Sequence, residues 1–214
     1  MEDNIKLPRQ VRSQQVKNRI FEAAVKLIKE HGYEYVTVNN VCSTAGVSVG
    51  SFYHHFANKD ELISYYLVAG YEKYQAEFED AVFDDVVGSV VKIYQIYSRF
   101  CMEQGLEFIK NYYNANNKSL DTSGANVRVP GKLPILYETY VVLTQAQEDG
   151  YIRSDVDTAQ LADDICTLEK GNIFEWALSD GRYDLMHNAE RMTRSYLRSF
   201  LTQKYIDEYL TAEK

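Results

Sequence analysis

The sequence predicts an all-α protein with about nine helices, in which a helix-turn-helix head precedes a larger helical body. Three observations support this prediction. Only 3 prolines and 11 glycines occur in 214 residues, which leaves room for long uninterrupted helices. Apolar residues recur at helical spacing, whereas no segment of any length alternates with the two-residue period of a strand. Capping residues and glycines separate the periodic stretches, as expected at helix ends.

The first helix is expected over about Gln15–His31, after a polar and loose arm at residues 1–14. Ile20 and Leu27 lie on one face of this helix, because residues seven apart are separated by about two turns. Gly32 follows the last periodic residue, in the position where glycine commonly ends a helix. The segment therefore predicts an amphipathic helix that packs against the helices after it.

Two short helices follow, joined by a glycine turn. Thr37 can cap a helix over Val38–Ala45 and Ser48 can cap another over Val49–His55, because hydroxyl side chains accept hydrogen bonds from the first turn of a helix. Gly46 supplies the turn, where a positive φ costs glycine little. This layout is typical of a helix-turn-helix whose second helix enters the major groove of DNA.

The two faces of the second short helix differ in character. Phe52 and Phe56 form an i,i+4 pair and are expected to point into a small core. Tyr53 and His54 then fall on the outward side. The helix lacks Arg, Asn and Gln, the residues that make good bidentate contacts to bases, so we expect modest base readout.

The rest of the chain is expected to be a helical body. Asn58 and Glu61 mark its first helix with a pattern close to a capping box. Helices are expected over Lys59–Phe83, Val86–Met102, a short segment that ends near Tyr113, Leu133–Glu148, Thr158–Leu178 and Tyr183–Lys204. The polar connection Asn114–Pro130 has no periodicity, and connections longer than ~15 residues are commonly functional. We therefore expect it to act as a gate to the body.

Charge is unevenly distributed along the chain. The net charge of −8 alone argues against nucleic acid as a partner. Residues 5–29, however, carry seven basic side chains and one acidic side chain, whereas residues 61–214 carry 15 basic and 25 acidic ones. A basic end on an acidic body is the electrostatic footprint of a protein that binds a polyanion.

Several function classes find no support in the sequence. The three cysteines Cys42, Cys101 and Cys166 and the four histidines show no metal-ligand spacing, so we expect neither a metal nor a cofactor. No P-loop, nucleophile elbow or dinucleotide fingerprint occurs, so we do not expect an enzyme. No apolar run approaches the ~18 residues of a membrane span and no signal-peptide core is present, which predicts a cytoplasmic protein.

The N-terminal part of the chain resembles the TetR/AcrR family of bacterial transcriptional regulators. The spacing of the matching residues is specific. They are Ile20, Ala23, Ala24, Leu27, His31, Gly32 and Tyr33, then Thr37, Val38 and Val41, then Ala45, Gly46, Val47, Ser48, Gly50, Phe52, Tyr53, His54, His55 and Phe56, and finally Asn58, Lys59, Asp60, Glu61 and Leu62.

The resemblance implies a homodimer that binds a palindromic double-stranded DNA operator and that a small molecule bound in the body releases. Repression is the usual mode of the family. The resemblance assigns a DNA-binding domain to residues 1–58 and an effector-binding and dimerisation domain to residues 59–214. It also implies DNA contacts, with Thr37, Tyr53 and Lys59 on phosphates. The full set is Thr37, Ser48, Val49, Gly50, Ser51, Tyr53, His54 and Lys59.

The body is rich in aromatic residues, since the chain contains 18 tyrosines. As a set, they predict a pocket for a flat or hydrophobic effector, with tyrosine hydroxyls as its polar groups. The residues expected to line this pocket are Tyr94, Tyr97, Phe100, Phe108, Tyr112, Tyr137, Tyr140 and Phe174.

The last two helices carry more apolar surface than one packing face needs. One apolar stripe docks a helix on its own domain, so a second stripe predicts contact with the same helices of another chain. The alternative is that both stripes pack within one chain. The residues expected at the dimer interface are Leu161, Ile165, Leu168, Asn172, Trp176, Met192, Tyr196 and Phe200.

A DNA-binding repressor controlled by a small aromatic or hydrophobic effector is therefore the function that the sequence favours. Two alternatives keep the DNA-binding head. In one, the body binds a protein partner instead of a small molecule. In the other, oxidation of Cys101 or Cys166 controls DNA binding.

Overall fold

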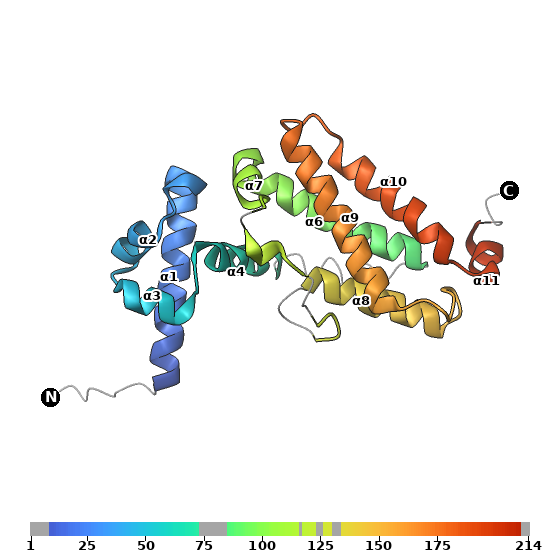
Figure 1. Ribbon diagram of the computed structural model, residues 1–214, viewed down its shortest axis with the longest axis horizontal. Coiled ribbons are helices and arrows are strands. Elements are labelled where there is room, and N and C mark those ends of the chain that lie inside the picture. Colours follow the sequence, from blue (N-terminus) through green and yellow to red (C-terminus); the bar gives the residue numbers. More distant parts are fainter. Residues whose placement is uncertain (1–8, 73–84, 116, 123–125, 130–133, 211–214) are drawn as a thin grey trace. The chain divides into compact units, whose positions relative to one another are not determined.

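A computed structural model describes residues 9–72, 85–115, 117–122, 126–129 and 134–210. Within these residues the regular secondary structure is helical, apart from an isolated β-bridge between Ile152 and Leu201, and the predicted all-α class is confirmed (Figure 1). The chain divides into two compact units, Met1–Leu67 with Asn114–Ser119 and Val68–Tyr113 with Leu120–Lys214. The predicted functional boundary after residue 58 stays a prediction.

The first unit contains the three helices of the head. They are α1 (Arg9–His31), α2 (Val38–Ala45) and α3 (Val49–His55), with a 3-10 turn at Tyr33–Tyr35. The helix α1 begins earlier than expected, so the prediction of a loose arm is wrong for residues 9–14, while residues 1–8 lie outside the described residues. Arginine and glutamine favour helix even where no apolar residue anchors the segment, which explains the earlier start.

A small core joins these three helices. The helix α1 packs against both α2 and α3. Ile20, Leu27, Val41, Phe52 and Phe56 are each at most 4% exposed. The predicted apolar face of α1 and the predicted inward pair on α3 are therefore confirmed.

The second unit contains the helices after α4 (Lys59–Glu72), except that the 3-10 turn at Lys118–Leu120 spans the division between the units. The helix α4 itself also spans this division, and its expected continuation to Phe83 lies outside the described residues. After it come α6 (Val86–Gln104), α7 (Leu106–Tyr112), a 3-10 turn at Lys118–Leu120, α8 (Pro134–Glu148), α9 (Thr158–Leu178), α10 (Leu185–Leu197), a 3-10 turn at Arg198–Phe200, α11 (Gln203–Tyr205) and a π-helical turn at Ile206–Leu210. None of the described helices combines the length and hydropathy that a membrane span requires.

The helix α6 is central to the core of the second unit. Both α8 and α10 pack against it, α9 packs against α8 and α10, and α7 packs against α9 (Figure 1). Val90 and Tyr94 of α6 meet Leu143, Ile165 and Leu197 from the surrounding helices, and each of these side chains is at most 1% exposed. Several helices cover α6, and apolar side chains therefore occur on almost every side of this helix.

The last predicted helix is interrupted. A continuous helix was expected over Tyr183–Lys204, but α10 ends at Leu197. Leu201 is extended and pairs with Ile152 in the β-bridge, and Thr202 then donates to the Gly150 carbonyl oxygen at 2.7 Å. The prediction failed because these partners come from a distant loop, which the periodicity of one segment does not reveal.

Leu120 and Thr122, in the connection after α7, are hydrogen-bonded to α9. Thr122 Oγ1 donates to Asp163 Oδ1 at 3.0 Å. Lys170 Nζ donates to Thr122 Oγ1 at 2.9 Å and to the Leu120 carbonyl oxygen at 3.2 Å. Part of Asn114–Pro130 lies outside the described residues, and its role as a gate stays a prediction.

Candidate DNA-binding site

Local side chains fix the turn between α2 and α3. Thr37 Oγ1 accepts from the Asn40 amide at 3.1 Å, and Ser48 Oγ accepts from the Ser51 amide at 3.1 Å, so both predicted caps are confirmed. Gly46 ends α2 in the left-handed conformation, with φ 61°, which glycine adopts without a steric penalty. These local interactions set the start of α3.

Arg19 holds the same turn from the side of α1. Its Nη2 donates to the carbonyl oxygens of Ala45 and Gly46, at 2.5 and 2.9 Å. These carbonyls lie at the C-terminal end of α2, where a cation is favourable. One of the basic residues of α1 thus stabilises the head itself.

The two faces of α3 separate as predicted. Phe52 and Phe56 are buried with ring centroids 5.9 Å apart, and they anchor the helix to the core. Outside this core, Val49 is 43% and Tyr53 55% exposed, and His54 is also exposed. Along the same surface Ser48 and Gly50 are exposed and Ser51 is half-buried. The expected DNA-contacting residues of α3 therefore share one accessible surface.

The two expected phosphate contacts outside α3 are held in different ways. Thr37 is exposed, and its hydroxyl can donate a hydrogen bond while its oxygen accepts the cap bond. Lys59 is half-buried, and its Nζ lies 4.2 Å from the centroid of the Tyr33 ring in a cation–π contact. Both side chains keep hydrogen-bond donors, as contact with a phosphate requires.

The start of α4 differs in detail from a capping box. Asn58 Oδ1 accepts from the Glu61 amide at 2.8 Å, as the predicted cap requires. Glu61 Oε2, however, accepts from the Ala57 amide at 2.6 Å, one residue before the cap. The carboxylate of Glu61 is therefore bound to the backbone that joins α3 to α4.

A groove of about 470 Å³ lies between α1 and α3. Its lining residues are Arg12, Ser13, Val16, Ser48, Gly50, Ser51, His54 and His55. Four of them were expected DNA contacts, whereas Arg12, Ser13, Val16 and His55 were not among those contacts. Only the packing of α1 beside α3 brings the two groups together. The signal in the sequence was the basic residues of the N-terminal arm and helix (Lys6, Arg9, Arg12 and Lys17), on which we expected part of the affinity for DNA to depend.

His55 is surrounded by groups that disfavour its charged form. Burial lowers the pKa of His55 below its ordinary 6.5, and the nearby His54 and Lys17 lower it further. The His54 and His55 ring centroids are 5.0 Å apart. Lys17 Nζ lies 4.2 Å from the centroid of the Tyr65 ring and 5.5 Å from that of Phe56, so aromatic faces fix this cation beside α3.

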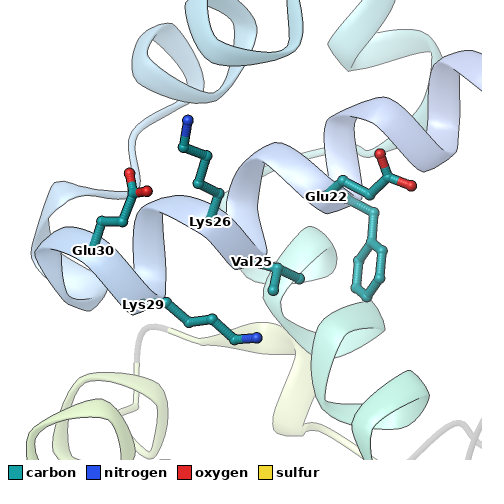
Figure 2. Close-up of a pocket in the computed structure, with 6 residues that line it drawn as sticks. Glu22, Val25, Lys26, Lys29 and Glu30 are labelled. Carbon is teal, nitrogen blue, oxygen red and sulfur yellow. The ribbon is translucent and has the colours of Figure 1, made fainter.

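A second hollow, of about 380 Å³, runs along α1. Figure 2 shows side chains that project from successive turns of this helix, and the lining residues are Phe21, Glu22, Val25, Lys26, Lys29 and Glu30. Two lysines and two glutamates balance one another, so the hollow has no preference for an anion. Phe21 also packs edge-on against the Tyr65 ring, with centroids 5.3 Å apart. The position and charge of the first groove therefore fit DNA better.

Most of the aromatic residues predicted to line an effector pocket lie inside the second unit. Tyr94, Phe100, Phe108 and Tyr112 are buried, and Tyr97, Tyr137 and Tyr140 are half-buried. Phe174 is 45% exposed on α9, and its assignment to the pocket stays a prediction. Helical periodicity places a residue on a face but does not identify what covers that face.

Phenols and thiols gather between α6 and α9. The hydroxyl oxygens of Tyr97 and Tyr113 lie 2.5 Å apart, and burial raises the pKa of both phenols well above 10. Burial also raises the pKa of Cys101 to about 12 and that of Cys166 to about 11. Because the thiolate is the form that attacks an oxidant, such thiols react slowly, and cysteine oxidation is not favoured as the signal.

The predicted dimer stripe packs largely within the single chain. Leu161, Ile165, Asn172 and Trp176 are at most 7% exposed within the single chain, and their assignment to a contact with another chain stays a prediction. The expected residues Leu168, Met192, Tyr196 and Phe200 are half-buried. The apolar side chains that α9 leaves exposed are Phe174 and Leu178, at 45% and 62%.

Comparisons with known proteins agree with this geometry. Residues 20–66, which include α2, α3 and the start of α4, match the family described as bacterial regulatory proteins, tetR family. The fatty acid metabolism regulator protein of Bacillus subtilis is 21% identical over 174 residues, covering 78% of this chain and 87% of that protein. The probable acrEF/envCD operon repressor of Escherichia coli is 22% identical over 208 residues, covering 91% and 90%.

A solved structure extends the similarity to the whole fold. The crystal structure of Thermus thermophilus FadR, a TetR family transcriptional repressor in complex with lauroyl-CoA, has a TM-score of 0.67 to this chain. The alignment covers 87% of this chain and 96% of that chain, at 17% sequence identity. The similarity therefore covers the helices of both units.

Proposed function

Because the chain belongs to the TetR family of bacterial transcriptional regulators, we propose that it is a repressor controlled by a small molecule. It binds a palindromic operator as a homodimer, and a hydrophobic effector in its body releases it from DNA. The family and fold are those of regulators and not of enzymes.

The outward face of α3 is the observation that supports DNA binding most directly. Phe52 and Phe56 anchor the helix from inside, while Val49, Tyr53 and His54 project outward. An α-helix fits the major groove of B-DNA, which is about 12 Å wide. The capped turn before α3 fixes its direction, so the outward side chains can meet base edges together.

Contacts to phosphates and contacts to bases have different roles in this proposal. Tyr53, Thr37 and Lys59 hold the protein on the backbone, while Ser51, His54 and the methyl groups of Val49 meet base edges. Bidentate contacts from Arg, Asn or Gln, worth ~1–3 kcal/mol each, are absent from α3. Each half-site therefore discriminates only modestly between base sequences. A two-fold dimer adds the binding free energies of two half-sites.

The proposed dimer uses α9 and α10. Phe174 and Leu178 give α9 an exposed apolar surface, and Met192, Tyr196 and Phe200 are partly open along α10 and the turn after it. A two-fold contact uses the same patch on both chains. Such a dimer must hold its two copies of α3 about 34–36 Å apart to reach successive major grooves.

The proposed effector is a hydrophobic molecule with a few polar groups. The aromatic body supports this class, and the Thermus thermophilus structure contains lauroyl-CoA. An effector that binds one conformation of the body more tightly shifts the equilibrium between conformations toward that one. The size of the shift is limited by the difference between its affinities for the two conformations. Release follows if that conformation changes the separation of the two copies of α3.

Selection of bound sequences from a random duplex pool, followed by footprinting, tests the DNA-binding part. We expect a two-fold symmetric site of about 15–30 bp, with affinity that falls steeply with salt. The Tyr53→Phe variant should weaken binding to every sequence alike, whereas Tyr35→Phe, at a tyrosine that is 48% exposed in the same unit, should leave it unchanged. Binding without a preferred site would reject the repressor.

The effector part has a separate test. Lauroyl-CoA is added to the complex of the full-length protein with the selected duplex, and free lauric acid and coenzyme A serve as comparisons. Release by lauroyl-CoA alone would support an acyl thioester as the effector. If none of the three changes the affinity while DNA binding persists, that effector class is rejected and the DNA-binding proposal stands.

A further inference from the structure

The groove between α1 and α3 is lined by groups that suit a phosphate. Arg12 supplies a positive charge, His54 and His55 supply imidazoles, and serine residues supply hydroxyl groups. None of its lining residues is acidic. Ser48 Oγ and Ser51 Oγ lie 2.9 Å apart and share a hydrogen bond at the edge of the groove. Its volume of about 470 Å³ leaves ample room for a phosphodiester.

On the basis of the proposed function, we propose that this groove seats a phosphate of the DNA backbone and that His55, with His54 beside it, takes up a proton when DNA binds. Arg12 gives the lining one positive charge when the His55 imidazole is neutral, and protonation of His55 raises this to two. The affinity for DNA then rises as the pH falls through the range in which histidine ordinarily titrates.

Without DNA, burial, His54 on α3 and Lys17 on α1 all favour the neutral form of His55. Lys17 on α1 and the adjacent His54 repel a proton on His55, and burial has the same effect, so its pKa lies below 6.5. Arg12 on α1 adds a further cation to the groove wall. The sequence of α2 contains one titratable side chain, Cys42, which is buried and whose pKa burial raises.

Three other charged side chains near α3, those of Arg19, Lys59 and Glu61, interact with groups outside the groove. Arg19 donates to the carbonyl oxygens at the end of α2. On α4, the Lys59 ammonium lies on the Tyr33 ring and the Glu61 carboxylate accepts from the Ala57 amide. Asp60 is half-buried in the first turn of α4 and does not line the groove. A phosphate in the groove would therefore add an anion beside His55, which favours the imidazolium.

Proton uptake gives two measurable signatures. One proton taken up on binding raises the affinity about tenfold for each unit by which the pH falls between the free and the bound pKa. Each positive charge added at a phosphate also steepens the slope of log affinity against log salt by about 0.9. A histidine with a purely structural role would leave that slope unchanged.

The first experiment measures binding by fluorescence anisotropy across pH and salt. The probe is a fluorescein-labelled duplex of about 30 bp and arbitrary sequence, because phosphate contacts do not depend on sequence. We expect the parent protein to bind about tenfold more tightly at pH 6 than at pH 7.5 and to show a steeper salt slope. In the double variant His54→Gln/His55→Gln, both differences should disappear.

A matched control comes from another exposed histidine of the head. His31 lies at the C-terminal end of α1, about 28 Å along the helix from Arg12. The His31→Gln variant should therefore keep the parental dependence on pH and salt. A parental pH profile in the His54/His55 double variant would overturn the inference and leave the proposed repressor intact. Failure of the parent to bind the duplex at any pH would reject both.

A second measurement needs no variant. The imidazole resonances of the parent protein are titrated by NMR alone, with the duplex, and with inorganic phosphate. A higher pKa of His55 with the duplex supports the inference, and an equal rise with inorganic phosphate would show that the groove also takes the free ion. An unchanged His55 titration in the presence of the duplex would overturn it.

Discussion

The substitution Glu169→Gln should stabilise the body at neutral pH and have little effect near pH 4.5. Glu169 is 2% exposed between α9 and α10. Its Oε1 accepts from Thr193 Oγ1 at 2.7 Å, and its Oε2 accepts from Asn172 Nδ2 at 2.9 Å. These hydrogen bonds lower the pKa of the carboxyl group, but the larger effect of burial raises it above 4.5. The site therefore favours the neutral acid.

The raised pKa fixes the sign of the pH dependence. Between pH 4.5 and the pKa of the folded state, folded Glu169 binds more protons than unfolded Glu169, so stability falls as the pH rises through this window. Each unit by which the folded pKa exceeds the unfolded one costs about 1.4 kcal/mol at neutral pH. Glutamine keeps the shape and can bond both neighbours, because the Thr193 hydroxyl can also accept. We therefore expect a gain in stability at pH 7.5 that disappears as the pH falls toward 4.5.

The fluorescence of Trp176 gives a selective assay. It is the only tryptophan of the chain and is buried on α9, so it reports the unfolding of the second unit. Urea titrations at pH 4.5 and 7.5 would compare the parent, Glu169→Gln and the control Glu175→Gln, at a glutamate that lies exposed on the same helix. If Glu169→Gln lowers the stability at pH 7.5 by about 1 kcal/mol or more, the charged carboxylate stabilises the fold and our reasoning is refuted.

Three further substitutions test the two units separately. Gly46→Ala should destabilise the head by about 1–2 kcal/mol, because alanine is strained at φ 61° and its Cβ would lie 3.1 Å from Arg19 Nη2; hydrogen exchange of the head amides measures this. Phe52→Ala should lower the free energy of unfolding of the head by about 3–5 kcal/mol. The unfolding of the body, followed by tryptophan fluorescence, should not change. An equal loss of stability in the body would contradict the view that the two units unfold separately. Tyr205→Phe removes the hydrogen bond of 2.7 Å to Asp85 Oδ1 and should cost the body about 1.5–3 kcal/mol in the same urea titration.

Helix ends in the head could be predicted because their signals are local. Thr37 and Ser48 cap the helices that directly follow them, and Gly46 supplies the positive φ between these helices. The same holds in the body, where Asp157 Oδ1 accepts from the amides of Ala159 and Gln160 at the predicted start of α9. Each signal involves residues close in sequence, so a single chain is enough to detect it.

The identity of the partner on each face could not be predicted. Ile165 and Trp176 lie on a predicted apolar stripe, but helices of their own chain cover them. Phe174 lies on the same helix and is exposed, although it was assigned to an interior pocket. Spacing along a helix determines which residues share a face. Which neighbour covers that face depends on contacts between distant segments.

The groove between α1 and α3 escaped prediction for the same reason, and it separates two properties of DNA binding. Phosphate contacts in this groove act on every sequence, whereas base contacts from Ser51 and His54 distinguish sequences. If proton uptake occurs mainly at His55, a lower pH should raise the affinity for preferred and random duplexes by similar factors and leave their ratio nearly constant. A change in the preferred sequence between pH 6 and pH 7.5 would instead place the titrating imidazole at a base edge, which would point to His54.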